Sequence, residues 1–361
     1  METVQRIENL RAWLSDQNLD AAYISSYENR RYFSGFTGSN GYLIITPSEL
    51  LLITDQRYTL QAKQQAVGYK VVTHLLDPIP TIKDTINSLS IRTLGYETRK
   101  LTDFDVRGYR SALPHINWVP MEDIGKQLRA VKDVGEQENL RRAIAIADRA
   151  VARLVNIIKP GMTEKEVAIE LEYILAKEGS EGPAFGTIVA SGLRGSLPHG
   201  GPTDKRIEAG DMVVVDCGAI FHGYHSDITR TIWVGEPSSR MVEIYKIVLD
   251  AQDQALSAIR PGITGGDIDR AHRLVFEQAG VEKYSLRGLG HGVGLEIHEQ
   301  PRVVIDSQEV IQPGMIFTVE PGLYLPDLGG VRIEDIVLVT ESGCEILTAC
   351  PKNLRVDHSA A

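Results

Sequence analysis

Cysteine is scarce in this chain of 361 residues, which has only three of them. Three cysteines give no disulfide framework and are typical of a protein from a reducing compartment. Long apolar runs are also missing, and the first twenty residues alternate charged and apolar side chains. Neither a signal peptide, a membrane anchor nor a transmembrane span is predicted from such a pattern. We therefore expect a cytoplasmic protein with no membrane partner.

Basic residues are also fewer than acidic ones. The chain has 38 Lys and Arg against 48 Asp and Glu, for a formal net charge of −10, and no long basic run. Because nucleic-acid binding depends on clustered Lys and Arg, this balance argues against a nucleic-acid partner. A hydrophobic share of 43% with 24% charged residues is that of a globular protein, and the length favours two domains.

Helix and strand patterns alternate over the first 130 residues. The expected helices cover residues 6–14, 58–66, 80–89 and 103–113, and the expected strands cover 21–24, 42–45, 51–54, 71–74, 93–96 and 116–120. Such alternation is typical of an α/β domain. A charged segment follows at 125–138. We place the domain boundary there, with domains 1–130 and 131–361.

The second part of the chain contains an internal repeat. A long amphipathic helix is predicted over residues 137–158, and the segment KPGMT at 159–163 ends it and starts the next helix, which runs to about residue 178. The same pattern returns as RPGIT at 260–264. The strand ending at Asp216 aligns with the strand ending at Glu320. Asp216 and Glu320 therefore occupy corresponding places in two halves, and such a duplication predicts a symmetric clamp around two metal ions.

Two apolar, β-branched runs around residues 212–216 and 228–234 predict a β-hairpin. A turn centred between Phe221 and His222 would place Asp216 directly opposite Asp227, with Cβ atoms about 5 Å apart. Two carboxylates facing each other in a buried sheet repel, and a divalent cation removes that repulsion.

The same arrangement is predicted downstream for residues 315–320 and 331–339. A turn near Asp327 would bring Glu320 opposite Glu334, and His291 lies between the two hairpins in a glycine-rich segment. The candidate metal ligands are Asp216, Asp227, His291, Glu320 and Glu334. Four carboxylates and one imidazole suit a pair of ions such as Mn²⁺, and the lack of thiolates argues against a structural zinc cage.

These five residues, with the segments HGVGLEIHEQP, EPGLY and GVRIED, resemble the pita-bread dinuclear metallopeptidases. Within that family the pattern is most similar to the Xaa-Pro dipeptidases (prolidases) and aminopeptidases P. The segments RYFSGFTGSNG and TDQRY are similar to the N-terminal domain of the same family. The resemblance implies an α+β fold class, in which a pseudo-symmetric pita-bread (creatinase/aminopeptidase) domain follows a smaller α/β creatinase-like domain. It also implies two divalent metal ions per chain, with Mn²⁺ first and Co²⁺ or Zn²⁺ as alternatives, and a homodimer.

The resemblance implies hydrolysis of the peptide bond before proline, in small peptides with proline in second position and with Xaa-Pro dipeptides favoured. The alternatives are an aminopeptidase P acting on longer peptides, a creatinase-like hydrolase and a non-enzymatic pita-bread binding module. Presence of all five ligands speaks against the last. By resemblance, Glu320 moves the proton as general base and then acid, and His199 and His298 bind substrate and stabilise the oxyanion. On residue type alone, His199 could be solvated surface and His298 a structural histidine.

Arg332 lies two residues before Glu334, so strand alternation puts both side chains on one face. We expect Arg332 to hold a ligand carboxylate and to contribute to substrate binding. His222 and His225 flank the first turn and are expected to be structural.

Arg287 is a departure from the family, which commonly has a histidine four residues before the ligand His291. An arginine cannot shuttle a proton, but its planar fork can bind a carboxylate. We predict that Arg287 binds the substrate carboxylate and favours dipeptides. The alternative is an ion pair with Glu282 or Glu296.

Overall fold

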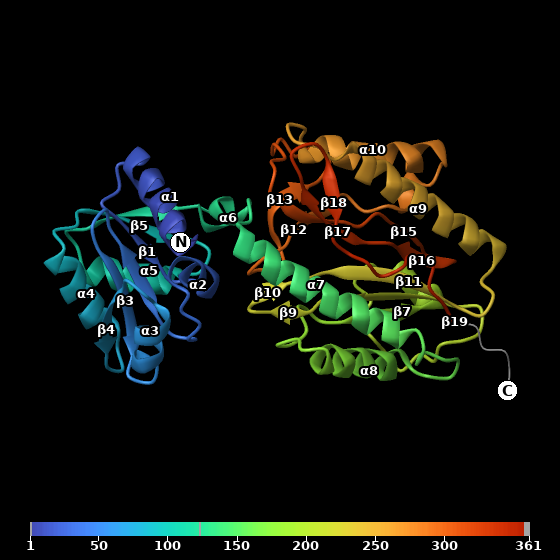
Figure 1. Ribbon diagram of the computed structural model, residues 1–361, viewed down its shortest axis with the longest axis horizontal. Coiled ribbons are helices and arrows are strands. Elements are labelled where there is room, and N and C mark those ends of the chain that lie inside the picture. The colour runs from blue at the N-terminus through green and yellow to red at the C-terminus, as the bar shows by residue number, and fades with distance from the viewer. Residues whose placement is uncertain (1, 123, 357–361) are drawn as a thin grey trace. The chain divides into compact units, whose positions relative to one another are not determined.

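The computed structural model describes residues 2–122 and 124–356, and the chain divides into two compact units between Leu128 and Arg129 (Figure 1). The boundary expected from the sequence was residue 130. In the described ranges, no helix combines the length and the apolar composition needed to cross a membrane.

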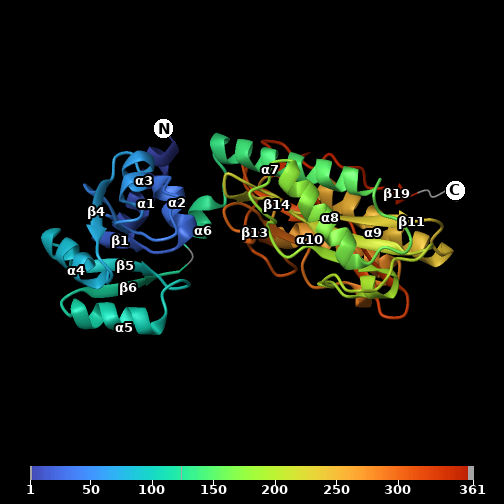
Figure 2. The same cartoon turned by 90° about the horizontal axis from the view of Figure 1, so that it is seen from below.

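A six-stranded mixed sheet, ordered β4-β3-β2-β1-β5-β6, forms the centre of the first unit. The strands are β1 (Ala21–Ile24), β2 (Tyr42–Ile45), β3 (Leu50–Asp55), β4 (Lys70–His74), β5 (Thr93–Glu97) and β6 (Asn117–Met121). The helices are α1 (Glu2–Asp16), α2 (Tyr27–Ser34), α3 (Thr59–Gln65), α4 (Ile79–Ser88) and α5 (Asp103–Ala112). One face of the sheet packs on α4 and α5, and Figure 2 shows α1 and α3 on the side opposite α5.

All ten helices and strands expected for this unit are present, with shifts only at their ends. The sequence did not predict α2 or α6 (Ile124–Arg129). Helix α2 buries Asn29 and Arg30, so it has no continuous apolar face that periodicity could reveal. The Arg30 guanidinium instead donates to the carbonyl oxygens of Gly38 and Gly41, at 2.5 and 2.9 Å.

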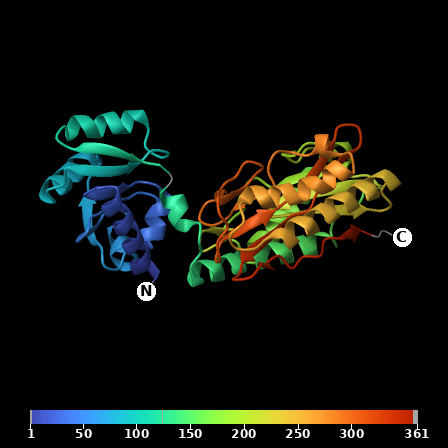
Figure 3. The ribbon, with the colours of Figure 1, turned by 90° about the horizontal axis from the view of Figure 1, so that it is seen from above.

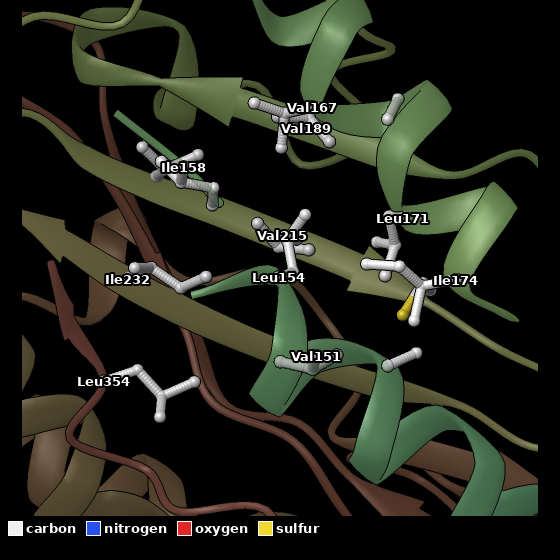
Figure 4. Packing of buried hydrophobic residues seen from close by; sticks show 14 of the residues in the cluster. Val151, Leu154, Ile158, Val167, Leu171, Ile174, Val189, Val215, Ile232 and Leu354 are labelled. Atoms are coloured by element: carbon white, nitrogen blue, oxygen red, sulfur yellow. The ribbon is translucent and has the colours of Figure 1, made fainter. Parts of the chain in front are cut away.

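The first half of the second unit is a sheet ordered β19-β11-β8-β7 with two helices packed against it. Its elements are α7 (Val134–Leu154), α8 (Glu164–Lys177), β7 (Ile188–Ser191), a 3₁₀ turn (Gly192–Ser196), β8 (Met212–Cys217), β9 (Ile220–Phe221), β10 (Tyr224–His225), β11 (Ile228–Val234) and β19 (Arg355–Val356). Figure 4 shows Leu154 of α7 and Leu171 of α8 packed with Val215 of β8. This core fixes β8, which carries Asp216, and β11, which begins directly after Asp227.

The second half has the same organisation, with a sheet ordered β13-β12-β14-β17-β18 and a separate β15-β16 hairpin. Its elements are α9 (Ser239–Ala258), α10 (Gly265–Gln278), a 3₁₀ turn (Glu282–Tyr284), β12 (Gly290–Gly292), β13 (Glu299–Val303), β14 (Ile316–Val319), β15 (Gly322–Leu325), β16 (Gly329–Arg332), β17 (Asp335–Val339) and β18 (Cys344–Ile346). Helices α9 and α10 lie side by side and cover this half (Figures 1 and 3).

The repeat found in the sequence is also a structural repeat. Thr163 and Thr264 each begin a helix with a capping box. The glycine two residues before each threonine has a positive φ, 91° at Gly161 and 90° at Gly262. Their amides donate to the carbonyl oxygens of residues 207 and 311, at 2.8 and 2.9 Å. The two halves therefore use the same turn to start corresponding helices.

The long helix expected over residues 137–158 is shifted towards the N-terminus. It begins at Val134, because Asp133 and Glu136 form a capping box that the sequence analysis overlooked. It ends at Leu154, and the amide of Ile157 bonds to the carbonyl of Leu154 in a turn at 2.8 Å. The apolar positions after Leu154 still pack on the core, so apolar periodicity placed the helix end too late.

Candidate metal centre

The predicted register of the first hairpin is wrong. Strands β8 and β11 pair with Asp216 opposite Thr229, two residues beyond Asp227. The turn residues are His222 and Gly223, with φ of 45° and 68°. A two-residue hairpin turn needs positive φ at both positions, and glycine adopts such values readily. A shift of two residues preserves the face, so Asp216 and Asp227 still point to the same side.

The predicted register of the second hairpin is confirmed. Val319 pairs with Asp335 in β14 and β17, and Gly322 pairs with Arg332 in β15 and β16. Both pairs belong to the register that sets Glu320 opposite Glu334. The turn lies at residues 326–328, around the predicted Asp327.

Carboxylates from both hairpins meet in one buried cluster. Ligand atoms of Asp216, Asp227 and Glu334 lie within 4.8 Å of one another. One oxygen of each is buried without a hydrogen-bond partner among the described residues: Asp216 Oδ1, Asp227 Oδ1 and Glu334 Oε1. His291 Nε2 lies 3.6 Å from Asp227 Oδ2 and 3.5 Å from Glu320 Oε1. The structure therefore brings together all five residues that the sequence predicted as ligands.

This cluster has too little positive charge for its carboxylates. Burial raises the pKa of Asp227 well above its ordinary value, and the charge of Glu334 raises it further. Burial likewise raises the pKa of Glu334, reinforced by Glu320. Burial raises the pKa of Glu320 to about 7, against the opposing effect of Arg332. Unpartnered, crowded carboxylate oxygens are the donor set that divalent cations bind, so these residues fit a metal centre.

His291 is prepared as a neutral ligand. Burial lowers its pKa to about 4. Its Nδ1 lies 3.1 Å from the carbonyl oxygen of Gly292, which can only accept, so Nδ1 carries the proton. The lone pair of Nε2 then faces the carboxylates, as in histidines that bind metals.

The Arg332 side chain donates four hydrogen bonds to protein groups around the cluster. Its NH2 donates to Asp216 Oδ2 at 2.5 Å and its Nε donates to Thr229 Oγ1 at 3.0 Å. Its NH1 donates to the Tyr324 hydroxyl at 2.8 Å and to the carbonyl of Pro198 at 3.1 Å. Arg332 therefore fixes a cluster carboxylate and also the residue that precedes His199.

Two threonines that the sequence analysis overlooked complete the support. The Thr229 hydroxyl donates to Glu334 Oε2 at 2.7 Å, and the Thr318 hydroxyl donates to Glu320 Oε1 at 3.1 Å. Strand alternation was the available signal, since Thr318 lies two residues before Glu320 and Thr229 two residues after Asp227.

A cavity of about 390 Å³ opens over the cluster. His199 and His298 are exposed on its wall, and the His298 ring centroid lies 4.2 Å from that of His291. Phe185, Ile188 and Ile297 give the wall an apolar part. The cavity thus combines the carboxylate cluster, two accessible imidazoles and an apolar surface.

Arg287 lies outside this arrangement. Its side chain is exposed, it does not line the cavity, and it forms no ion pair within residues 2–122 and 124–356. Glu296, one of its expected partners, instead accepts from Arg129 at 2.6 Å. The described residues therefore show no ion pair of Arg287 with Glu282 or Glu296. His225 packs its Nδ1 at 3.1 Å from the carbonyl oxygen of Gly294, outside the carboxylate cluster.

Comparison with known proteins agrees with this site. The model of metallopeptidase family M24 matches residues 138–341, and that of the creatinase/prolidase N-terminal domain matches residues 6–131. The chain belongs to metallopeptidase family M24. As a member of this family it is a hydrolase that acts on peptides with divalent metal ions. The predicted pita-bread fold with a creatinase-like N-terminal domain is confirmed.

Relatives in the M24 family match nearly the whole chain. A Xaa-Pro dipeptidase of Pyrococcus furiosus is 40% identical over 352 residues, which cover 97% of this chain and 99% of the relative. The structure of a Xaa-Pro dipeptidase from Bacillus anthracis is 41% identical, with a TM-score of 0.96 and coverage of 98% and 99%. That of an X-Pro aminopeptidase from Thermotoga maritima is 42% identical, with a TM-score of 0.91 and coverage of 97% and 99%.

Proposed function

We propose that this M24 metallopeptidase hydrolyses the peptide bond before proline and favours Xaa-Pro dipeptides. The observation that carries the proposal is the cluster of buried, unpartnered carboxylates with His291 Nε2 beside it, open to a cavity of about 390 Å³. Relatives that match nearly the whole chain and are named Xaa-Pro dipeptidase support the substrate class.

The proposed cofactor is a pair of divalent metal ions, with Mn²⁺ favoured by a donor set of carboxylate oxygens and one imidazole. The proposed ligands are Asp216, Asp227, His291, Glu320 and Glu334. Bound there, the ions would supply Lewis acidity that polarises the scissile carbonyl and makes water more acidic.

The chain's own residues would handle the protons and the developing charge. Glu320 is the proposed general base and acid, because its side chain is 27% exposed at the cavity, against 11% for Asp216 and 8% for Asp227, and can therefore reach both water and the leaving nitrogen. His199 and His298 are the proposed donors to the oxyanion, because both are accessible on the cavity wall. Arg332 would act mainly by holding Asp216 and Tyr324, since its donors already bind protein groups.

The second candidate is an aminopeptidase that removes the first residue from longer peptides with proline in second position. It is favoured by the 42% identity and TM-score of 0.91 to the X-Pro aminopeptidase from Thermotoga maritima. We further propose a homodimer and a cytoplasmic location. The location is supported by the three cysteines, which are free and therefore suit a reducing compartment.

The test is hydrolysis of Ala-Pro, Ala-Pro-Ala and Ala-Ala by protein stripped with a chelator and then reconstituted with Mn²⁺, Co²⁺ or Zn²⁺. We expect the stripped protein to be inactive, the Mn²⁺ form to hold two ions per chain, and Ala-Pro to be the best substrate. Faster cleavage of Ala-Pro-Ala would favour the aminopeptidase. Equal cleavage of Ala-Ala, or full activity without metal, would overturn the proposal.

A further inference from the structure

A buried ion cluster lies beside the cavity and takes no part in the proposed chemistry. The Glu299 carboxylate accepts from Arg129 Nε at 2.9 Å and from Lys132 Nζ at 3.3 Å. The side chains of Glu299 and Lys132 are 0% exposed and that of Arg129 is 1% exposed. Burying three charged groups costs free energy unless they pair well. A buried cluster of this kind is therefore a candidate for a functional role.

The same carboxylate holds the loop between β12 and β13. The amide of Glu296 donates to Glu299 Oε1 at 3.1 Å, and the Glu296 carboxylate accepts from Arg129 NH2 at 2.6 Å. A Cβ atom added to Gly294 would lie 2.4 Å from Glu299 Oε2, so the loop backbone passes directly over the carboxylate. The loop is therefore wrapped around one buried anion.

This loop connects two of the three histidines of the site. His291 lies in β12 at its start, and His298 is the residue immediately before Glu299. At its tip, the carbonyl of Gly294 accepts from the amide of His225 at 2.8 Å. His298 lines the cavity wall and is bonded directly to Glu299, so the backbone that Glu299 anchors also sets the point from which the His298 side chain extends.

Charge balance keeps the anchor ionised. Burial alone would raise the pKa of Glu299, but Arg129 and Lys132 outweigh it and the pKa lies below the ordinary value. Arg129 and Lys132 supply two positive charges, and Glu296 and Glu299 supply two negative charges. Neutralising Glu299 would leave Lys132 buried without its counter-charge and release the amide of Glu296.

We propose that Glu299, clamped by Arg129 and Lys132, is a positioning residue that sets His298 for oxyanion stabilisation. This inference rests on the proposed function. Misplacing a catalytic group by about 1 Å can cost about 100-fold in rate. A change at Glu299 should therefore act on turnover through His298 rather than through the metal ions.

The experiment is a double-mutant cycle between Glu299→Gln and His298→Ala, with Ala-Pro as substrate and Mn²⁺-loaded protein. Arg129→Lys is the second variant, because it keeps the charge but loses the fork that joins Glu299 to Glu296. Glu97→Gln is the matched control in the other unit. Glu97 is also buried, at 6% exposed, and holds backbone amides of Ser25 and Ser26 at 2.6 and 2.7 Å.

We expect Glu299→Gln to lower kcat by about 100-fold with little change in KM or in metal content, and Arg129→Lys to lower it by a smaller factor. In the His298→Ala background, Glu299→Gln should lower kcat by less than about threefold, because the group it positions is gone. Glu97→Gln should leave kcat unchanged. Equal fold losses in both backgrounds, or loss of metal, would overturn the inference.

A readout without turnover separates this inference from the proposed function. In protein with ¹³C- and ¹⁵N-labelled histidine, the His298 ring signals are assigned by their absence from His298→Ala. We expect Glu299→Gln and Arg129→Lys to move those signals and Glu97→Gln to leave them in place. Inactivity of the unaltered protein on Xaa-Pro peptides would refute the proposed function alone. Unmoved His298 signals would refute the positioning role, whatever the substrate.

Discussion

Asp216 and Glu320 occupy corresponding places in the two halves of the catalytic unit, yet their surroundings differ. Asp216 is buried, with 11% of its side chain exposed, and is held by Arg332 at 2.5 Å. Glu320 is 27% exposed, and the hydroxyl of Thr318 donates to it at 3.1 Å. One carboxylate is thus fixed by a permanent cation, whereas the other is held by a neutral hydroxyl.

Because of this difference, Asp216 and Glu320 have separate roles although they occupy corresponding positions. The Arg332 guanidinium donates a charge-assisted hydrogen bond to Asp216 and fixes its direction, which suits a permanent metal ligand. In the metal-free protein, burial raises the pKa of Glu320 to about 7, so Glu320 can then gain and lose a proton near neutral pH. A repeated scaffold therefore supplies two carboxylates in equivalent places, and their neighbours decide which one exchanges protons.

The strongest test of the comparison changes one carboxylate in each half. Asp227→Asn and Glu334→Gln remove one charge each from a buried cluster in which both have raised pKa values. We expect each to abolish turnover, by at least about 1,000-fold, while the fold persists, because an amide keeps the shape but binds cations weakly. Metal content by atomic emission and folding by circular dichroism check this. Near-full activity and metal content in either variant would contradict the two-metal site.

The next test concerns the accessible histidines. His199→Ala and His298→Ala should each lower kcat by about 100-fold, because each removes a donor to the oxyanion. The metal content should stay at that of the unaltered protein, since neither side chain belongs to the carboxylate cluster. Steady-state kinetics and metal analysis on the same preparations give both quantities. Loss of an ion from either variant would make that histidine a metal ligand.

The pH dependence of metal binding tests the difference between Asp216 and Glu320 in another way. In the metal-free protein the pKa of Glu320 is raised to about 7, so below pH 7 a cation must displace its proton. Metal affinity should therefore fall by up to about tenfold per pH unit as the pH drops from 7 to 6, and change less above pH 8. Calorimetric titration with Mn²⁺ at pH 6, 7 and 8 measures it. Glu320→Gln should make the profile shallower but not flat, because the pKa values of Asp227 and Glu334 are also raised and a cation must displace their protons as well. A flat profile in the unaltered protein would exclude this protonation.

The smallest expected effect is at Arg287, outside the pseudo-symmetric cluster. If Arg287 binds the substrate carboxylate, Arg287→Ala should lower kcat/KM for Ala-Pro by about threefold to tenfold and leave its C-terminal amide unaffected. Lys283→Ala is the control, because it removes another exposed cation from the same segment between α10 and β12. Arg287 directly follows Leu286, which lines the cavity. Equal losses on both substrates would rule out the predicted role.

Much of this site could be predicted from the sequence, because its ligands lie on strands with regular alternation. The second hairpin register was predicted correctly, since its turn signal around Asp327 is centred between the strands. The first was wrong by two residues, because the backbone of His222 and Gly223 decides the turn rather than the apolar runs. Because side chains alternate along a strand, an error of two residues still placed Asp216 and Asp227 on one face.

The supporting groups were beyond the reach of pattern and spacing. Arg129 and Glu299 are 170 residues apart in the chain, and nothing local marks them as partners. The contact of Arg332 with the carbonyl of Pro198 likewise joins two distant segments. Ligands can be recognised by residue type and strand face, whereas the residues that orient them are defined only by tertiary packing.

The matching turns at Gly161 and Gly262 also bear on how such a centre could arise. A single copy of the helix-and-hairpin unit supplies two carboxylates, which leaves a dinuclear cluster half built. Two identical copies related by a two-fold axis would supply four, with the metal ions placed on or beside that axis. In a symmetric ancestor of this kind, Asp216 and Glu320 would have been the same residue. Only after fusion into one chain could Arg332 hold one copy while the other became a proton carrier.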